Sequence, residues 1–164
     1  MNTSRSNTTT RTSTTAKPAK DALALLESDH EDVSQLFAEY EKTRSDARKT
    51  ALVAEICTAL SVHAQIEEEI FYPAVKSALK DKFLVPEATV EHASVKDLID
   101  QLESSEPGGE MYDAKVTVLS EYVKHHVKEE QDEMFTKVQS SSLDLVELGA
   151  RMTARKEELL AVAA

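Results

Sequence analysis

The sequence predicts an all-α protein, folded as an antiparallel up-down four-helix bundle with a short extra C-terminal helix. Only 3 Gly and 4 Pro occur in 164 residues, a composition that favours helices. Apolar residues recur at steps of three and four, which is the period of an amphipathic helix. Short polar segments separate four long helical patterns, and short connections join antiparallel neighbours.

Two apolar stripes predict the first helical hairpin. The first helix begins at Asp21, and its stripe consists of Leu23, Leu26, His30, Val33, Phe37 and Tyr40. The polar run 42–46 predicts the turn. The stripe of the second helix consists of Leu52, Ile56, Leu60, His63, Glu67, Ile70 and Phe71. Pro73 should end this helix or kink its last turn, because proline has no backbone N–H.

A second hairpin follows residues 80–85, and Pro86 should open its first helix. The stripe of that helix consists of His92, Val95, Leu98, Ile99 and Leu102. Residues 104–109 (Ser-Ser-Glu-Pro-Gly-Gly) form the clearest break in the domain. The stripe of the fourth helix consists of Met111, Tyr112, Leu119, Tyr122, His126, Glu130 and Met134. After Ser140–Ser142, a fifth helix on the outside is predicted from Leu145, Leu148, Met152 and Leu159.

Charge and cysteine content argue against several classes of protein. The net charge of -11 argues against nucleic acid and anionic membranes as partners, because both repel an acidic surface. No stretch approaches 18 consecutive apolar residues. Cys57, the single cysteine, excludes an internal disulfide and fits a reducing compartment. We therefore expect a cytoplasmic protein, monomeric or weakly dimeric.

Residues 1–20 differ in composition from the rest of the chain. They contain seven Thr, three Ser, four basic residues and no acidic residue. With almost nothing apolar to bury, this segment is predicted to be a disordered basic tail, although a transit peptide would share the same bias. The folded domain should then span residues 21–164.

One motif occurs twice. His63-x3-Glu67 returns 63 residues later as His126-x3-Glu130, and each copy is preceded by a lone histidine, His30 or His92. Residues four apart lie on one helical face, so an imidazole and a carboxylate can converge on one metal ion.

The repeated motif favours a metal site over a hydrogen-bonded core. A single histidine in an apolar stripe is more often a core residue than a ligand. Burying two glutamates as well is costly unless a cation compensates them, although a polar seam of Glu–His hydrogen bonds is the alternative. Imidazole and carboxylate suit iron, manganese or zinc, and six ligands suit two ions bridged by the glutamates. The predicted ligands are His30, His63, Glu67, His92, His126 and Glu130.

Helix geometry chooses among neighbouring candidates. Glu67 lies about 40° around the helix from His63, whereas Glu68 lies about 140° away, so Glu68 and Glu69 are assigned to a solvated face. His125 points about 100° from His126 and is assigned to the surface or to an outer contact, with a His125–Glu130 pair as the alternative.

Other residues leave further alternatives open. Tyr122 lies one turn before His126 and could reach the site, but core packing is favoured. Cys57 is expected to be a small core residue. A ferritin-like di-iron bundle would need two Glu-x-x-His motifs, and only Glu27–His30 fits.

Residues 21 to about 160 resemble a hemerythrin-like (HHE cation-binding) domain. The resemblance rests on His30, His63-x3-Glu67 with Phe71-Tyr72-Pro73, Glu91-His92, and His125-His126-x3-Glu130 with Met134-Phe135. It implies a four-helix bundle with a non-haem di-iron centre, in which oxygen and carboxylates bridge two iron ions. The ligands that it carries over are His30, His63, Glu67, His92, His126 and Glu130.

The sequence departs from the oxygen-carrying hemerythrins at two ligand positions. Lys96 stands where those proteins have a second histidine on the third helix. Gln131 stands where they have an aspartate, and Glu130 serves instead. One iron should therefore have more room for water, peroxide or a replacement ligand, which argues against reversible oxygen carriage. Thr136 replaces the proline of the first repeat, for which we expect only a local difference.

Three functions follow from this reading. The first is a di-iron protein that binds oxygen, nitric oxide or iron itself, for sensing, storage or a stress response. The second is a catalase-like enzyme that decomposes peroxide by redox cycling of two irons. The third is a structural bundle that holds zinc or no metal.

Overall fold

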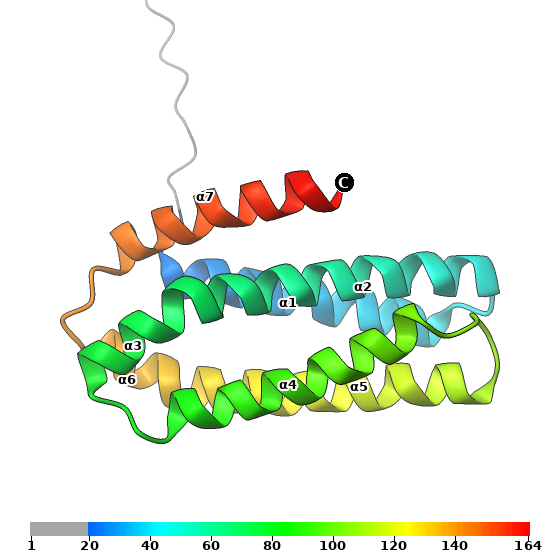
Figure 1. The fold of residues 1–164 in the computed structure, drawn as a ribbon, viewed down its shortest axis with the longest axis horizontal. Coiled ribbons are helices and arrows are strands. Elements are labelled where there is room, and N and C mark those ends of the chain that lie inside the picture. Colours follow the sequence, from blue (N-terminus) through cyan, green and yellow to red (C-terminus); the bar gives the residue numbers. More distant parts are fainter. Residues whose placement is uncertain (1–19) are drawn as a thin grey trace, which may run out of the picture.

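The computed structural model describes residues 20–164, which form an antiparallel helical bundle and confirm the predicted fold class (Figure 1). Nearly all of the predicted basic tail, residues 1–20, lies outside the described residues. The four long helices are α1 (Ala22–Lys42), α2 (Asp46–Ile66), α4 (Leu84–Glu103) and α5 (Glu110–Glu129).

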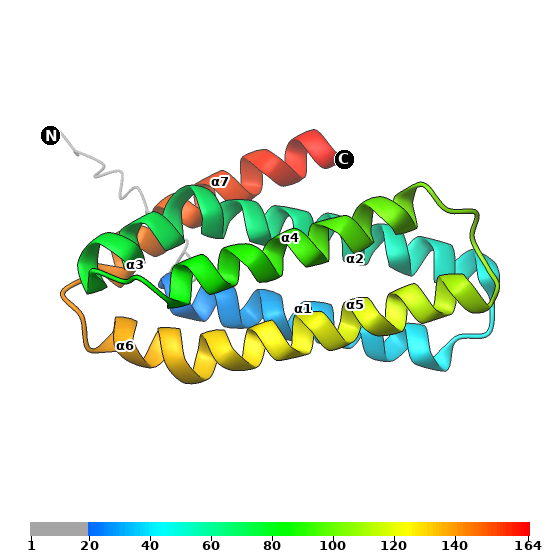
Figure 2. The ribbon, with the colours of Figure 1, turned by 60° about the horizontal axis from the view of Figure 1, so that its bottom comes forward.

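Two of the long helices continue through a π-helical turn into a shorter α-helix. These continuations are η1 (Glu67–Phe71) with α3 (Tyr72–Leu79), and η2 (Glu130–Met134) with α6 (Phe135–Gln139). Both extensions lie at the same end of the bundle (Figure 2). Pro73 does not end its helix, since the chain stays helical to Leu79; the alternative prediction, a distorted turn, agrees with the π turn just before it. The wide π turn ahead of Pro73 relieves the clash that a proline ring meets in a regular α-helix.

Side chains that accept backbone hydrogen bonds fix where the helices begin. Asp21 accepts a hydrogen bond from the N–H of Ala24, and Ser45 and Asp144 cap α2 and the last helix in the same way. Each of these caps satisfies an N–H that has no partner within its helix.

The connection between α4 and α5 contains the predicted break at residues 104–109. Gly108 and Gly109 have φ angles of 93° and 90°, which side chains disfavour, so glycine is required there. Helix α4 begins at Leu84, and Pro86 is therefore its third residue and not its first.

The apolar core consists of two clusters at opposite ends of the bundle. One cluster includes Phe71, Val75 and Met152, and the other includes Leu52, Ile56 and Leu119. Cys57 belongs to the second cluster, as expected, and its burial raises the pKa of the thiol to about 12. The buried histidines and glutamates belong to neither cluster.

The extra C-terminal helix, α7 (Leu145–Ala163), packs against α1 and α2 (Figure 1). Gly149 of α7 lies close to the backbone just before α1, since a Cβ atom there would lie 2.6 Å from the backbone carbonyl oxygen of Lys20. Helix α7 therefore covers one hairpin of the bundle. In residues 20–164, no helix is both long and apolar enough to cross a membrane.

Candidate metal centre

The structure brings all six predicted ligand residues together. They come from α1, α2, η1, α4, α5 and η2, and none of their side chains is more than about a tenth exposed. These residues are His30, His63, Glu67, His92, His126 and Glu130. They form two groups, each with two histidines.

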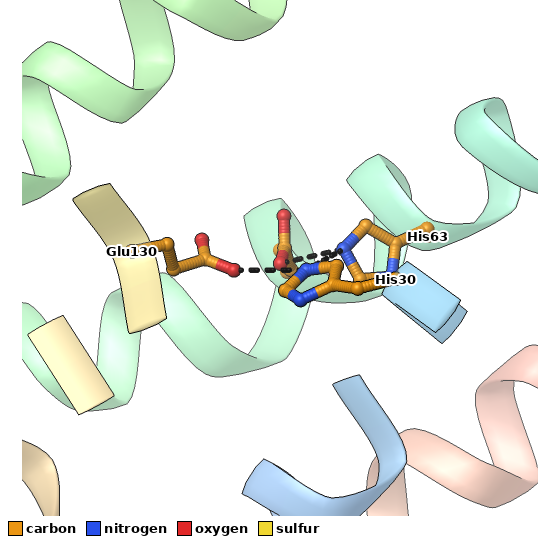
Figure 3. Close-up of side chains that lie close together, drawn as sticks. His30, His63 and Glu130 are labelled. Atoms are coloured by element: carbon orange, nitrogen blue, oxygen red, sulfur yellow. Dashed lines mark hydrogen bonds and ion pairs between the residues drawn. The ribbon is translucent and has the colours of Figure 1, made fainter. Parts of the chain in front are cut away.

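The first group joins His30 and His63 to both glutamates. The Nε2 atoms of the two histidines are 3.2 Å apart. Nε2 of His63 lies 2.9 Å from Oε1 of Glu67. Nε2 of His30 lies 3.3 Å from Oε1 of Glu130, whose carboxylate points at the His30 ring (Figure 3).

The second group repeats this arrangement with His92 and His126. Their Nε2 atoms are also 3.2 Å apart. Oε2 of Glu67 lies 3.1 Å from Nε2 of His92, and Oε2 of Glu130 lies 3.3 Å from Nε2 of His126. Each glutamate therefore presents one oxygen to each group, which is how a carboxylate bridges two metal ions.

Each glutamate begins a π turn. The N–H of Tyr72 bonds to the carbonyl of Glu67, five residues earlier, and the N–H of Phe135 bonds in the same way to Glu130. π turns are rare and occur frequently at functional sites. The turn changes which later residues face the site, and a projection at 100° per residue cannot predict this.

Tyr72 is a site residue that the sequence analysis quoted in a motif but did not assign. Its hydroxyl oxygen lies 2.5 Å from Oε2 of Glu130 and 3.1 Å from Oε2 of Glu67. It also lies 3.2 Å from Nε2 of His92 and 3.3 Å from Nε2 of His126. The phenol is thus a seventh candidate donor, and it belongs to the second group.

The outer nitrogen of every histidine also has a partner. Nδ1 of His63 lies 3.0 Å from Asp29, and Nδ1 of His126 lies 3.0 Å from Glu91. For the other two histidines, Nδ1 of His92 lies 3.1 Å from Glu68, and Nδ1 of His30 lies 2.7 Å from Gln131. Such contacts fix the ring orientation and leave Nε2 free to bind a metal.

The assignment of Glu68 to a solvated face is therefore wrong. Glu68 contacts His92 and also accepts hydrogen bonds of 2.7 Å from Lys96. Glu69 does face outward, where it pairs with Arg155 of α7. The Lys96 side chain is about half exposed and pairs with Glu68, so it does not reach the site. Helix α4 therefore offers one histidine, His92, to the site.

Negative charge raises the pKa of two buried imidazoles, those of His63 and His126. Burial alone would lower the pKa of His63, but the charge of Glu67 and the hydrogen bond that His63 donates to Asp29 outweigh it and raise the pKa to about 10. Burial opposes charge at His126 as well, and Glu130 raises the pKa of that histidine to about 9. Burial and the charges of both glutamates raise the pKa of the Tyr72 phenol well above its usual range.

Two buried carboxylate oxygens indicate whether a cation fits the site. Oε1 of Glu67 and Oε1 of Glu130 accept no hydrogen bond of good geometry within the described part of the chain, and each has only a histidine nitrogen beside it, at 2.9 Å and 3.3 Å. Burying an unsatisfied carboxylate oxygen is costly, and a metal ion removes that cost. Neutral imidazoles, carboxylates and a phenol are donors that suit iron, manganese or zinc. The residues fit a metal site.

Three other residues lie away from the six. His125 is on the surface as predicted, and it pairs with Glu129 at 3.2 Å and not with Glu130. Tyr122 is 46% exposed, so it neither reaches the site nor packs in the core. Met111, which was predicted to lie in the apolar stripe, is 70% exposed in the first turn of α5.

A buried cluster of four histidines and two glutamates in a helical bundle defines a candidate metal-binding protein. Residues 21–138 match the hemerythrin HHE cation-binding domain. The chain belongs to the hemerythrin HHE cation-binding family, as the sequence motifs predicted.

Similar proteins come from bacteria. The crystal structure of a hemerythrin HHE cation-binding domain-containing protein from Mycobacterium kansasii superposes with a TM-score of 0.73 and 25% identity, covering 87% of this chain and 89% of that one. The uncharacterized protein Rv2633c of Mycobacterium tuberculosis is 30% identical over 117 residues, covering 66% of this chain and 67% of that protein. A protein of Nostoc sp. described as a DNA nickase is 26% identical over 117 residues, and the match covers 71% of this chain but 33% of the nickase.

Proposed function

We propose that the protein is a non-haem di-iron protein that binds a small ligand (oxygen, nitric oxide or peroxide) or handles iron itself. The observation that carries the proposal is the sharing of both glutamates between two histidine pairs. Glu67 and Glu130 each direct one oxygen to each pair. Two ions bound in this way would be bridged by both carboxylates, and each would also have two imidazoles.

A small apolar cavity beside the histidines supports a small-molecule ligand. Its volume is about 30 Å³, and it is lined by all four histidines of the site together with apolar residues such as Val33, Leu60, Val95 and Val123. A space of this size holds a molecule as small as water. The apolar walls favour uncharged diatomic ligands over ions.

The chain's own residues would prepare this site for two irons. The outer contacts of Asp29, Glu68, Glu91 and Gln131 hold the four rings in place. The valine-lined cavity excludes bulk water. Tyr72 can donate its proton to Glu130 or give an oxygen to the second ion. The two irons, when bound, supply redox chemistry and open positions for a ligand.

Peroxide decomposition is the second candidate, because the two groups are unequal. The second group has the Tyr72 oxygen in addition to two imidazoles and the shared carboxylates. The first group has Phe135 stacked on His30, with ring centroids 6.1 Å apart, and this ring offers no donor. An ion there would keep more positions for peroxide or water.

Metal per chain and the absorption spectrum test the proposal on protein made with iron supplied. About two irons per chain with near-ultraviolet charge-transfer bands is the expected result. Zinc alone, or less than one metal per chain after iron loading, would contradict it and favour a structural bundle. Oxygen release on adding peroxide, beyond the amount of iron present, separates the enzyme from the binding protein.

A further inference from the structure

The two halves of the bundle share their ligands but differ on their outer faces. Counted from the paired histidines, Val62 and Ile66 of the first half correspond to His125 and Glu129 of the second. Val62 and Ile66 are buried, and Ile66 belongs to the cluster that includes residues of α7. No helix of residues 20–164 covers the second half in this way, and the His125 side chain is 65% exposed.

Counted from the lone histidines, Asp29 of the first half corresponds to Glu91 of the second. Each accepts a hydrogen bond from the outer nitrogen of a candidate ligand, His63 or His126. Lys156 of α7 neutralises Asp29, with its Nζ 2.5 Å from Oδ1. Within residues 20–164, no Lys or Arg forms an ion pair with Glu91. The second half therefore lacks the positive charge that α7 supplies to the first.

Glu91 instead has two further candidate metal ligands beside it. Glu91, His125 and Glu129 each offer one donor atom, and these atoms all lie within 4.8 Å of one another. Glu91 and His125 border a surface hollow of about 180 Å³, which Ser94 and Tyr122 also line. An imidazole with two carboxylates suits a divalent transition metal, which would supply the missing positive charge.

A second hollow, of about 20 Å³, is lined both by residues of this acidic face and by residues of the buried centre. Glu87, Glu129 and Glu133 line it at the surface, and His126 and Glu130 line it inside. Glu130 is 3% exposed; its Oε2 faces His126, whereas its Oε1, which accepts no hydrogen bond, faces His30 on the far side. In the first half, Leu25 and Ile70 stand where Glu87 and Glu133 stand here, so only the second half has an acidic path inward.

We propose that Glu91, His125 and Glu129 form an outer cation site that captures Fe²⁺ and passes it along this acidic hollow to His126 and Glu130. This inference rests on the proposed function, since it names the route by which metal reaches the centre. Carboxylates at an entrance raise the local concentration of cations and speed their capture, by roughly ten- to a thousandfold in known cases. The apolar cavity on the other side of the histidines would serve neutral ligands.

The rate of metal uptake tests the route. Apoprotein is mixed anaerobically with Fe²⁺, and a ferrous chelator added at successive times captures the iron that has not reached the buried centre. The test variant is His125→Asn with Glu129→Gln, which leaves Glu91 in contact with His126. The matched control is Glu157→Gln, the same change of charge on an exposed residue of α7. We expect uptake about tenfold slower in the test variant alone, with less difference at high salt and the same final iron per chain.

Four results would overturn the inference. Uptake at the wild-type rate in the test variant would show that the outer site plays no part in iron uptake. Equal slowing in Glu157→Gln would show that only the overall charge of the protein matters. A lower final iron content in the test variant would mean that these residues store metal and do not deliver it. A wild-type protein that takes up no Fe²⁺ would contradict the proposed function itself, and the inference with it.

Discussion

Tyr72 and Phe135 hold equivalent places after the two π turns, and Tyr72 alone carries a hydroxyl group. The Tyr72 oxygen lies within 3.3 Å of both histidines of the second group and of both glutamates. The Phe135 ring stacks on His30 at an interplanar angle of 12°. The two groups are otherwise nearly symmetric, so the Tyr72 hydroxyl oxygen makes their sets of donor atoms unequal.

Tyr72→Phe should abolish this inequality without removing the metal. The six other donors remain, so we expect iron per chain to stay near the wild-type value. Any visible absorption from a phenolate bound to ferric iron should disappear. The control is Tyr40→Phe, since Tyr40 donates its hydrogen bond to Asp113, away from the site. An unchanged visible spectrum in Tyr72→Phe would show that the phenol donates a hydrogen bond and does not bind iron.

Glu67→Gln and Glu130→Gln should each weaken metal binding by more than about tenfold, because loss of an outer partner alone costs that much. Both changes replace a shared carboxylate with a neutral amide of similar size. The helical circular dichroism should not change. His125→Ala should keep the full metal content at equilibrium. A large loss of bound metal in His125→Ala would mean that the surface histidine is a ligand.

The apoprotein should lose stability as the pH rises from about 7 to 10. The pKa values of His63 and His126, about 10 and about 9, lie above the ordinary value of 6.5. A group whose pKa is raised on folding stabilises the fold fully below its unfolded pKa, and this contribution is lost as the pH passes the folded pKa. Urea unfolding of apoprotein at several pH values measures the effect.

Metal loading tests the same two protonated histidines in a second way. A metal ion displaces protons from its ligands, so iron uptake by the apoprotein near pH 8 should release about two protons from these imidazoles. Loaded protein should show little of the alkaline loss of stability. A flat stability profile for the apoprotein would mean that the buried imidazoles are neutral without metal.

Lys156→Met should lower the free energy of unfolding by about 1–3 kcal/mol. The change removes the cation partner of Asp29, which is 8% exposed and contacts His63. Removing one member of a buried ion pair leaves the other charge poorly compensated, although the remaining contact of Asp29 with His63 and the partial exposure of Lys156 reduce the cost.

The control for Lys156→Met is Lys96→Met. Lys96 pairs with Glu68 in an equivalent contact, but its side chain is 49% exposed. We expect Lys96→Met to lower the free energy of unfolding by less than about 1 kcal/mol. Urea unfolding of both variants measures the difference, and equal costs would show that burial under α7 adds nothing to the pair.

The sequence predicted the bundle and the clustering of the six residues because helical periodicity holds up to each glutamate. His63 and His126 lie within regular helix, and Glu67 and Glu130 follow directly after its last residue. The prediction for Glu68 failed because the π turn begins at Glu67. Pro73 does not cause that turn, since Thr136 occupies the equivalent place after the second one.

Contacts between distant helices could not be predicted from periodicity. Gln131 reaches His30 across 101 residues, and Lys156 reaches Asp29 across 127. A projection of one helix assigns a face but does not identify what packs on it. Tyr122 was misplaced for this reason, since it lies on the edge of α5 where no neighbour covers it.

The two π turns also affect how the chain tolerates changes in length. A π turn holds one more residue between hydrogen-bonded partners than an α turn does. Deleting a single residue between Glu67 and Phe71 would let the segment close into regular helix, at no cost in hydrogen bonding. Tyr72 and the residues after it would keep their places, because the wide turn takes up the surplus residue; regular helix that kept this residue would instead rotate them by about 100°. The position of Tyr72 thus depends on the wide turn, and an alignment of relatives should allow a one-residue gap there in each half.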